Sequence, residues 1–153
     1  MKYLLLSILL IPAISLLGQA SETVEVQETI QELFDGMRAG DSTKVHRVFK
    51  DEVRMLSVYT NKKGEERSQE GKLSDFLKGV GTPHDAIWDE RIGNLSIKVD
   101  GRLAQAWVPY HFYLGDHFSH CGVNTFQLIK EAGHWKIINL TDTRRTKDCP
   151  SLN

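Results

Sequence analysis

The spacing of apolar residues along this chain changes at His84, and this change limits which folds the chain can adopt. From His84 to Arg144, apolar and polar residues alternate, which is typical of strands with one buried face. Short turns that contain glycine divide the segment at Asp100-Gly101, Gly115-Asp116 and Ala132-Gly133. Such turns join antiparallel neighbours. The predicted strands form an antiparallel meander and lie at 86–99, 102–114, 117–130 and 135–144.

Before His84 the period is helical. Apolar residues recur three or four positions apart on the first predicted helix: Val26, Ile30, Leu33, Phe34 and Met37. Gly40 can supply a left-handed stop, and Asp41 can cap a second, shorter helix. A β-rich run at 53–59 and a third helix near 73–80 follow. The sequence therefore predicts an α+β fold, with three N-terminal helices packed on one face of a curved antiparallel sheet.

The register of the strands decides which side chains face the helices. On the second long strand, the inward series is Ala104, Ala106, Val108, Tyr110 and Phe112. If the Gly115-Asp116 turn contains a β-bulge, the same face continues with Phe118, His120, Gly122, Asn124, Phe126, Leu128, Trp135, Ile137 and Asn139. Without a bulge the parity reverses, and Trp107, His111 and Tyr113 join His120. We favour the bulged register, which keeps each apolar series on one face and places Asp142 outward.

A polar cluster interrupts the apolar face in this register. Tyr110, His120 and Asn124 lie at one end of it, and Gly122 leaves space beside them. These three residues are the candidate ligand-binding side chains of a pocket for a small molecule. In the alternative interpretation, they only satisfy one another and nearby backbone groups. The opposite face carries Trp107, which indicates an interface for a possible homodimer.

The N-terminal segment predicts export. Lys2 precedes the uncharged apolar run at 4–17, and small residues end it at Gly18 and Ala20. We therefore expect a signal peptide at 1–20, a mature domain at 21–153, and a periplasmic or secreted protein. The alternative, a membrane anchor, is disfavoured because about 14 apolar residues fall short of the ~20 needed to span a bilayer.

Export also affects how the two cysteines are interpreted. Cys121 and Cys149 are expected to form a disulfide in an oxidising compartment. The alternative is a nucleophilic Cys121 beside His120.

Charge and motifs exclude several classes of function. Nineteen Lys and Arg against twenty Asp and Glu leave a net charge of -1, without the basic excess of a nucleic-acid-binding protein. No phosphate loop, dinucleotide fingerprint or nucleophile elbow is present. Four residues within ten positions could supply a metal site: His111, Asp116, His117 and His120. Asp116 and His117 lie in or beside a turn, so an ordinary turn is preferred. We expect no metal and no cofactor.

Several segments resemble the nuclear transport factor 2-like superfamily. They are the helical hairpin that ends at Gly40-Asp41, and the segments 106–113 (AWVPYHFY), 118–122 (FSHCG), 126–128 (FQL), 135–138 (WKII) and 142–145 (DTRR). More narrowly, they look like its exported bacterial "putative lumazine-binding" members, which are close to the polyketide-cyclase-like (SnoaL-like) and ketosteroid-isomerase-like branches. The resemblance implies a cone-shaped α+β fold, a hydrophobic pocket inside a curved sheet, and frequent dimerisation through the sheet. It implies no catalytic assignment.

Three functions remain open on these observations. The preferred one is a binding protein that holds a small apolar or aromatic ligand in the pocket. The second is an acid–base enzyme of the isomerase, cyclase or dehydratase type, with His120 as the proton carrier and Asp89 or Glu90 as candidate carboxylates at the cavity mouth. The third is an interaction domain with a filled core, which acts through the face around Trp107.

Overall fold

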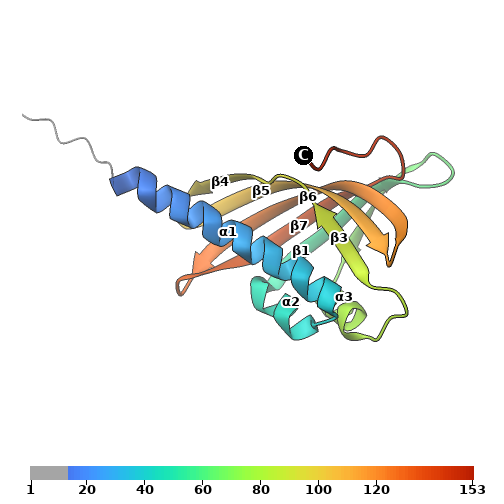
Figure 1. Ribbon diagram of the computed structural model, residues 1–153, viewed down its shortest axis with the longest axis horizontal. Helices are drawn as coiled ribbons and strands as arrows, with labels where there is room; N and C mark the ends of the chain where they lie inside the picture. Colours follow the sequence, from blue (N-terminus) through green and yellow to red (C-terminus); the bar gives the residue numbers. More distant parts are fainter. Residues whose placement is uncertain (1–13) are drawn as a thin grey trace, which may run out of the picture.

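The computed structural model describes residues 14–153, with side chains from residue 20 onward. Three helices are present in this part of the chain: α1 (Ile14–Ala39), α2 (Ser42–Val48) and α3 (Leu73–Gly81). The strands are β1 (Phe49–Thr60), β2 (Glu66–Gly71), β3 (Trp88–Ile92), β4 (Ser96–Asp100), β5 (Leu103–Leu114), β6 (His117–Glu131) and β7 (His134–Arg144). In Figure 1, α1 runs along the curved sheet, and α2 and α3 lie at one end of it.

The strands form one unclosed sheet in the order β2-β1-β7-β6-β5-β3, and β4 also pairs with β5. The predicted α+β class and the packing of helices on the sheet are confirmed. The sheet is mixed rather than antiparallel, because β1 pairs in parallel with β7. A hairpin turn in the sequence indicates pairing only between two consecutive strands. The paired residues of β1 and β7 are at least 85 positions apart, as in Arg54 and Asn139, and no local turn signals the pairing.

The strand predicted at 86–99 is two strands. Gly93 separates β3 from β4, and its amide donates to the carbonyl of Pro109 (2.8 Å). A Cβ at this position would lie 2.7 Å from the Cα of Leu152. The chain therefore passes close to its own C-terminal tail at a point where only glycine fits.

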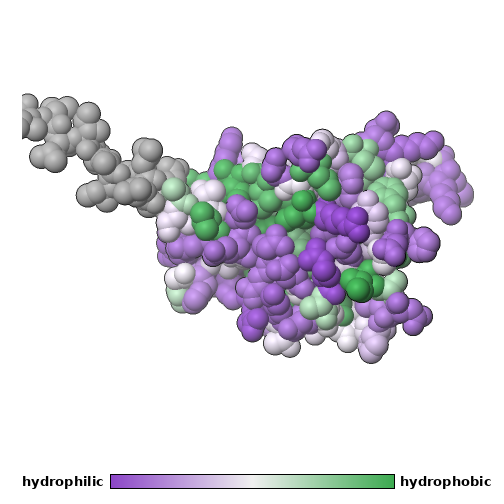
Figure 2. All heavy atoms as spheres, in the orientation of Figure 1, coloured by the Kyte–Doolittle hydropathy of each residue, from purple (hydrophilic) through white to green (hydrophobic). Residues whose placement is uncertain are grey.

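The buried face of α1, the end of α1 and the start of α2 agree with the predicted pattern. The buried apolar stripe of α1 is the predicted one: Val26, Ile30, Leu33, Phe34 and Met37. Gly40 follows with a positive φ of 66°, and the Asp41 carboxylate accepts from the amide of Lys44 at 2.9 Å to cap α2. Figure 2 shows hydrophilic surface over most of this side of the molecule, with apolar surface along the seam between α1 and β4.

Two irregularities set which residues of the sheet face the helices. The first lies in β6, where Phe112 pairs with His120 but Tyr113 pairs with Phe118. Ser119 is therefore the extra residue of a β-bulge. His120 and every second residue after it face inward, as the bulged register predicts. The bulge lies at Ser119 and not in the predicted Gly115-Asp116 turn. The prediction was therefore wrong for Phe118, which precedes the bulge, faces outward and is 42% exposed.

The second irregularity lies in β7 and was not predicted. Gln127 pairs with Asn139, but Leu128 pairs with Ile137, so one residue is inserted between them. The insertion reverses the parity of the rest of β7. Asn139, predicted inward, faces outward, and Asp142, predicted outward, pairs with Asn124 on the inner face and is 9% exposed.

The tail after β7 folds back over the outer face of the sheet (Figure 1). Cys121 and Cys149 form a disulfide, and the Pro150 carbonyl lies 3.0 Å from His111 Nε2. The carbonyl of Leu152 accepts from the amide of Asn94 (3.3 Å). The tail is therefore fixed to the sheet beside β3 and β6.

Most of the predicted signal peptide lies outside the residues that the structure describes. Residues 1–13 of the predicted signal peptide lie outside the described part of the chain. No helix within residues 14–153 is both long enough and apolar enough to cross a membrane.

Candidate functional site

A cavity of about 700 Å³ lies between the helices and the inner face of the sheet. Most of its wall is apolar: Leu33, Phe34, Met37, Met55, Leu56, Phe76, Trp88, Phe112, Leu114 and Leu140. The exposed residues Gln69, Glu70, Lys72 and Asp75 line it where β2 leads into α3. The volume is within the range of small-molecule sites.

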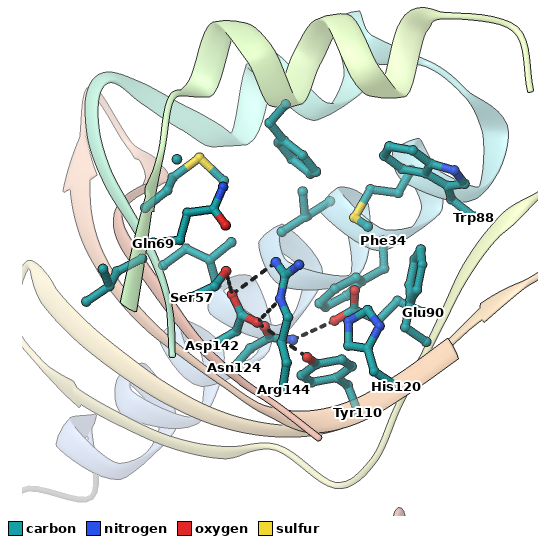
Figure 3. A pocket seen from close by; sticks show the side chains of 18 of the residues that line it. Phe34, Ser57, Gln69, Trp88, Glu90, Tyr110, His120, Asn124, Asp142 and Arg144 are labelled. Carbon is teal, nitrogen blue, oxygen red and sulfur yellow. Dashed lines mark hydrogen bonds and ion pairs between the residues drawn. The ribbon is translucent and has the colours of Figure 1, made fainter. Parts of the chain in front are cut away.

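The sheet end of the cavity carries a cluster of polar side chains (Figure 3). Asp142 is the centre of this cluster, because its carboxylate accepts from Ser57 Oγ (2.6 Å) and from Arg144 Nε (2.7 Å). Arg144 Nε meets Oδ2 of Asp142, and Arg144 Nη2 lies 3.4 Å from Oδ1, the oxygen that Ser57 also contacts. The guanidinium therefore approaches Asp142 through two nitrogens. These partners engage both oxygens of Asp142 and fix the orientation of Arg144, whose side chain is 49% exposed.

Tyr110 is fully buried beside this pair, and a glycine accounts for its position. Its hydroxyl donates to the carbonyl of Thr143 (2.8 Å) and lies 3.4 Å from Asp142 Oδ2. A Cβ on Gly122 would lie 1.8 Å from that same carbonyl oxygen. The space that we expected Gly122 to leave for a ligand therefore holds the Thr143 carbonyl, which anchors Tyr110.

The environment of Tyr110 keeps it protonated. Burial raises the pKa of Tyr110, and the neighbouring Asp142 and Glu90 carboxyl groups raise it further. Because its single proton is donated to Thr143, the hydroxyl of Tyr110, which lines the cavity, can only accept a hydrogen bond from a ligand.

Glu90 is the second carboxyl group of the cavity. Its Oε1 accepts from Asn124 Nδ2 at 2.6 Å. Burial raises the pKa of Glu90 to about 7, with a further contribution from the negative charge of Asp142. Glu90 therefore stays protonated between about pH 4.5 and pH 7, where an ordinary glutamate is charged.

His120 lies on the same inner face, opposite Phe112. Its Nδ1 is 3.0 Å from Ser119 Oγ, and its ring meets the Tyr110 ring edge-on at 5.7 Å between centroids. Burial lowers the pKa of His120, and the positive Arg144 lowers it further, while Asp142 acts in the opposite direction. The imidazole is therefore uncharged at neutral pH.

The three predicted ligand-binding residues all line this cavity, together with residues that the sequence did not identify. Tyr110, His120 and Asn124 are brought together, but each is hydrogen-bonded to another group rather than to the other two. Sequence reasoning considered Glu90 only as a carboxylate at the mouth, and it missed Ser57 and Arg144. The adjacent pair Ile137-Ile138 breaks strict alternation, which is compatible with a bulge but does not by itself fix where the bulge lies.

The other sequence hypotheses have definite outcomes. Cys121 is bonded to Cys149, so it is not a free nucleophile. Within residues 14–153, no group of three or more His, Cys, Asp or Glu side chains is arranged to hold a metal ion.

A family model described as "Putative lumazine-binding" matches residues 21–141. No protein among the curated ones matches the chain.

Solved structures share the fold at low sequence identity. A nuclear transport factor 2-like protein of unknown function from Shewanella baltica is 15% identical, with a TM-score of 0.65 over 86% of this chain and 97% of the other. A protein with a cystatin-like fold from Nostoc punctiforme is 12% identical, with a TM-score of 0.64 over 86% and 96%. The β subunit of a "putative aromatic-ring-hydroxylating dioxygenase" from Novosphingobium aromaticivorans is 12% identical, with a TM-score of 0.67 over 91% and 96%.

Proposed function

Because the chain belongs to the "putative lumazine-binding" family of the nuclear transport factor 2-like superfamily, we propose that it is an exported protein that binds a small, largely aromatic molecule in its cavity. The observation that carries this proposal is the cavity of about 700 Å³, which has apolar walls and polar groups at one end. Sites for small molecules combine these two features, since apolar walls supply affinity and a few polar groups fix orientation.

The apolar wall suits a flat ring. Trp88 stacks on His84 at 4.4 Å between ring centroids and meets Phe112 edge-on at 6.3 Å, so its position is set on two sides. Phe34 enters from α1 and contacts Phe126 edge-on at 6.3 Å. Aromatic rings that their neighbours hold in place lose little freedom when a ring-shaped ligand packs against them.

The polar end suits an uncharged ligand. Asp142 and Arg144 neutralise each other, His120 is uncharged at neutral pH, and Glu90 is protonated below about pH 7. An anion or a cation would meet no group of opposite charge that is left unpaired there. A neutral heterocycle with ring nitrogens and carbonyls can instead accept from Glu90 and donate to Tyr110.

Export is proposed from the N-terminal segment and is consistent with the disulfide. The apolar run at 4–17 has the composition and length of a signal peptide, with cleavage near Ala20. A Cys121–Cys149 bond persists in oxidising compartments such as the periplasm or the extracellular space.

Calorimetric titration with lumazine, supported by native mass spectrometry for retained molecules, tests the binding proposal. Asn124→Leu removes a polar group from the cavity, and Asn139→Leu makes the same change on the outer face of the sheet. We expect Asn124→Leu to weaken binding about tenfold, the effect of losing one hydrogen bond in a buried site. Asn139→Leu should have no effect. The proposal fails if no lumazine binds and no molecule is retained, or if both variants bind equally.

One observation favours an acid–base enzyme as the second candidate. Glu90 has a pKa of about 7 and uses only one of its oxygens in the bond to Asn124, so it can give or take a proton near neutral pH. Exchange of acidic C–H protons of a bound carbonyl compound in D₂O, followed by NMR, tests this candidate. Wild-type protein should speed the exchange, and Glu90→Gln should stop it without loss of binding. Equal exchange by both proteins would exclude Glu90 as the base.

A further inference from the structure

The outer face of the sheet carries a second concave site, on the side of the sheet away from the cavity. A groove of about 460 Å³ crosses β4, β5, β6 and β7 there. The C-terminal tail does not cover it, because the tail is held at His111, Cys121 and Asn94, nearer the other end of β5. The groove therefore lies open on the sheet face that the helices leave uncovered.

The register of the four strands arranges the side chains of the groove in two parallel rows. The first row crosses the sheet through Ser96, Trp107, Thr125 and Thr141. The second row crosses it through Lys98, Gln105, Gln127 and Asn139. Neighbouring strands lie about 4.8 Å apart, so each row is roughly 14 Å long. One exposed indole thus lies beside a ladder of three amide side chains.

The groups of the groove can bond to a ligand without breaking structural bonds. The side-chain amides of Gln105 and Gln127 are exposed and make no hydrogen bond within the described part of the chain. The Thr141 hydroxyl donates to Asn139 Oδ1 (3.0 Å), which fixes the Asn139 side chain and leaves its amide nitrogen unused. Trp107 is 55% exposed, so one face of its indole is open to a ligand.

We propose that this groove binds a neutral oligosaccharide. Each sugar hydroxyl both donates and accepts, and an amide side chain offers both functions in fixed positions. The C–H groups on one face of a sugar ring form an apolar surface that packs on an exposed indole. Among the described residues, Lys98 is the one charged side chain that lines the groove, and the groups beside Trp107 are uncharged hydroxyls and amides, which suit an uncharged ligand.

The same chemistry argues against a second copy of the chain as the occupant. The cores of homodimer interfaces are mostly apolar, whereas amides, hydroxyls and one ammonium surround Trp107. Pairing two such faces would bury the Lys98 ammonium of each copy, and no carboxylate among the described residues lines the groove to pair with it. A sugar leaves the exposed Lys98 of the edge strand β4 in water and supplies hydroxyl partners to the amides.

Titration of the disulfide-bonded protein with three neutral hexasaccharides tests this proposal. The probes are cellohexaose, maltohexaose and the hexamer of N-acetylglucosamine, followed by calorimetry and by tryptophan fluorescence. We expect at least one probe to bind, and Trp107→Ala to weaken that binding about tenfold. Trp107→Phe should retain most of the affinity because it keeps an aromatic face. Ile87→Ala, which truncates an equally exposed apolar side chain (59%) outside the groove, should leave binding unchanged.

Three results would overturn the proposal. The first is that none of the probes binds at millimolar concentration. The second is that Trp107→Ala binds as wild type does. The third is a dimer in sedimentation analysis that Trp107→Ala dissociates, which would assign the face to a second copy of the chain. Since Trp107 is exposed, its variants should keep the wild-type unfolding temperature, and this measurement confirms that each variant is folded.

Discussion

Replacing Glu90 with glutamine should remove most of the decline in stability that we expect as the pH rises from 5 to 8. The carboxyl group has an ordinary pKa of 4.5 in the unfolded chain and about 7 in the folded protein. A raised carboxyl pKa means that folding favours the protonated form. Its contribution to stability is therefore complete below about pH 4.5, and it is lost as the pH rises through 7. Glutamine is uncharged at every pH in this range and contributes no such dependence.

The size of the effect follows from the difference between the two pKa values. Each unit of pKa corresponds to about 1.4 kcal/mol, and the shift of Glu90 is expressed mostly between pH 5 and 8. The free energy of unfolding of the wild type should fall by about 2 to 3 kcal/mol across that range from this group alone. The residue as a whole is partly exposed, but the pKa depends on the carboxyl group, which lies against Asn124 in the enclosed end of the cavity.

Urea unfolding at pH 5, 6, 7 and 8 measures this dependence. The quantity to compare is the free energy of unfolding of Glu90→Gln minus that of the wild type, which should rise by about 2 to 3 kcal/mol from pH 5 to pH 8. The comparison cancels the contribution of His120, whose lowered pKa makes stability fall as the pH drops below its ordinary value of 6.5. A difference that stays constant with pH would refute the placement of Glu90 in a desolvated site.

Three further substitutions test the contacts around the cavity and the tail. Asp142→Asn should lower the free energy of unfolding by about 1 to 3 kcal/mol in urea unfolding, because Arg144 and Ser57 lose a charged acceptor in a partly buried site. Gly122→Ala should cost about 2 to 3 kcal/mol by the same measurement, since its Cβ would overlap the Thr143 carbonyl and force β6 and β7 apart. Cys149→Ser should lower stability by about 3 to 4 kcal/mol in thermal unfolding, because the bond closes a loop of 28 residues.

Matched controls separate these effects from general damage. Asp35→Asn breaks an exposed ion pair with Arg38 and should cost less than about 0.5 kcal/mol. Gly71→Ala places its Cβ at an ordinary 3.4 Å from Met55 and should be tolerated. For the disulfide, the wild type under reducing conditions should match Cys149→Ser. If a control costs as much as its test variant, the corresponding contact does not carry the stability assigned to it.

Local patterns determined the helices and the hairpins. The stripe from Val26 to Met37, the stop at Gly40 and the three glycine turns each involve neighbours in sequence, so periodicity and turn chemistry suffice to identify them. The inward placement of Tyr110, His120 and Asn124 also followed from alternation, once one bulge was allowed. The position of these three residues of the candidate site could therefore be predicted from the sequence.

The placement of the other polar residues of the site, Asp142 and Arg144, depends on a register shift that only packing decides. One residue inserted in β7 turns Asp142 and Arg144 from the solvent side to the cavity. A bulge adds a single residue with no fixed sequence signature, and its place depends on which side chains the facing strand and the helices can accommodate. Asp142 then gains Ser57 as a partner, because the parallel pairing of β1 with β7 brings together residues 85 positions apart in the chain.

The sequence by itself determined an α+β chain with an apolar inner face, a polar cluster on that face, and two cysteines suited to an oxidising compartment. Only the tertiary structure decided that the cluster contains a carboxylate–guanidinium pair and a glutamate with a raised pKa, and that the outer face carries a groove beside a fixed tail. The physical reason is that alternation along a strand is a local property of the chain. Parity after a bulge, the pairing of distant strands and the desolvation of Glu90 are set by contacts between segments far apart in sequence.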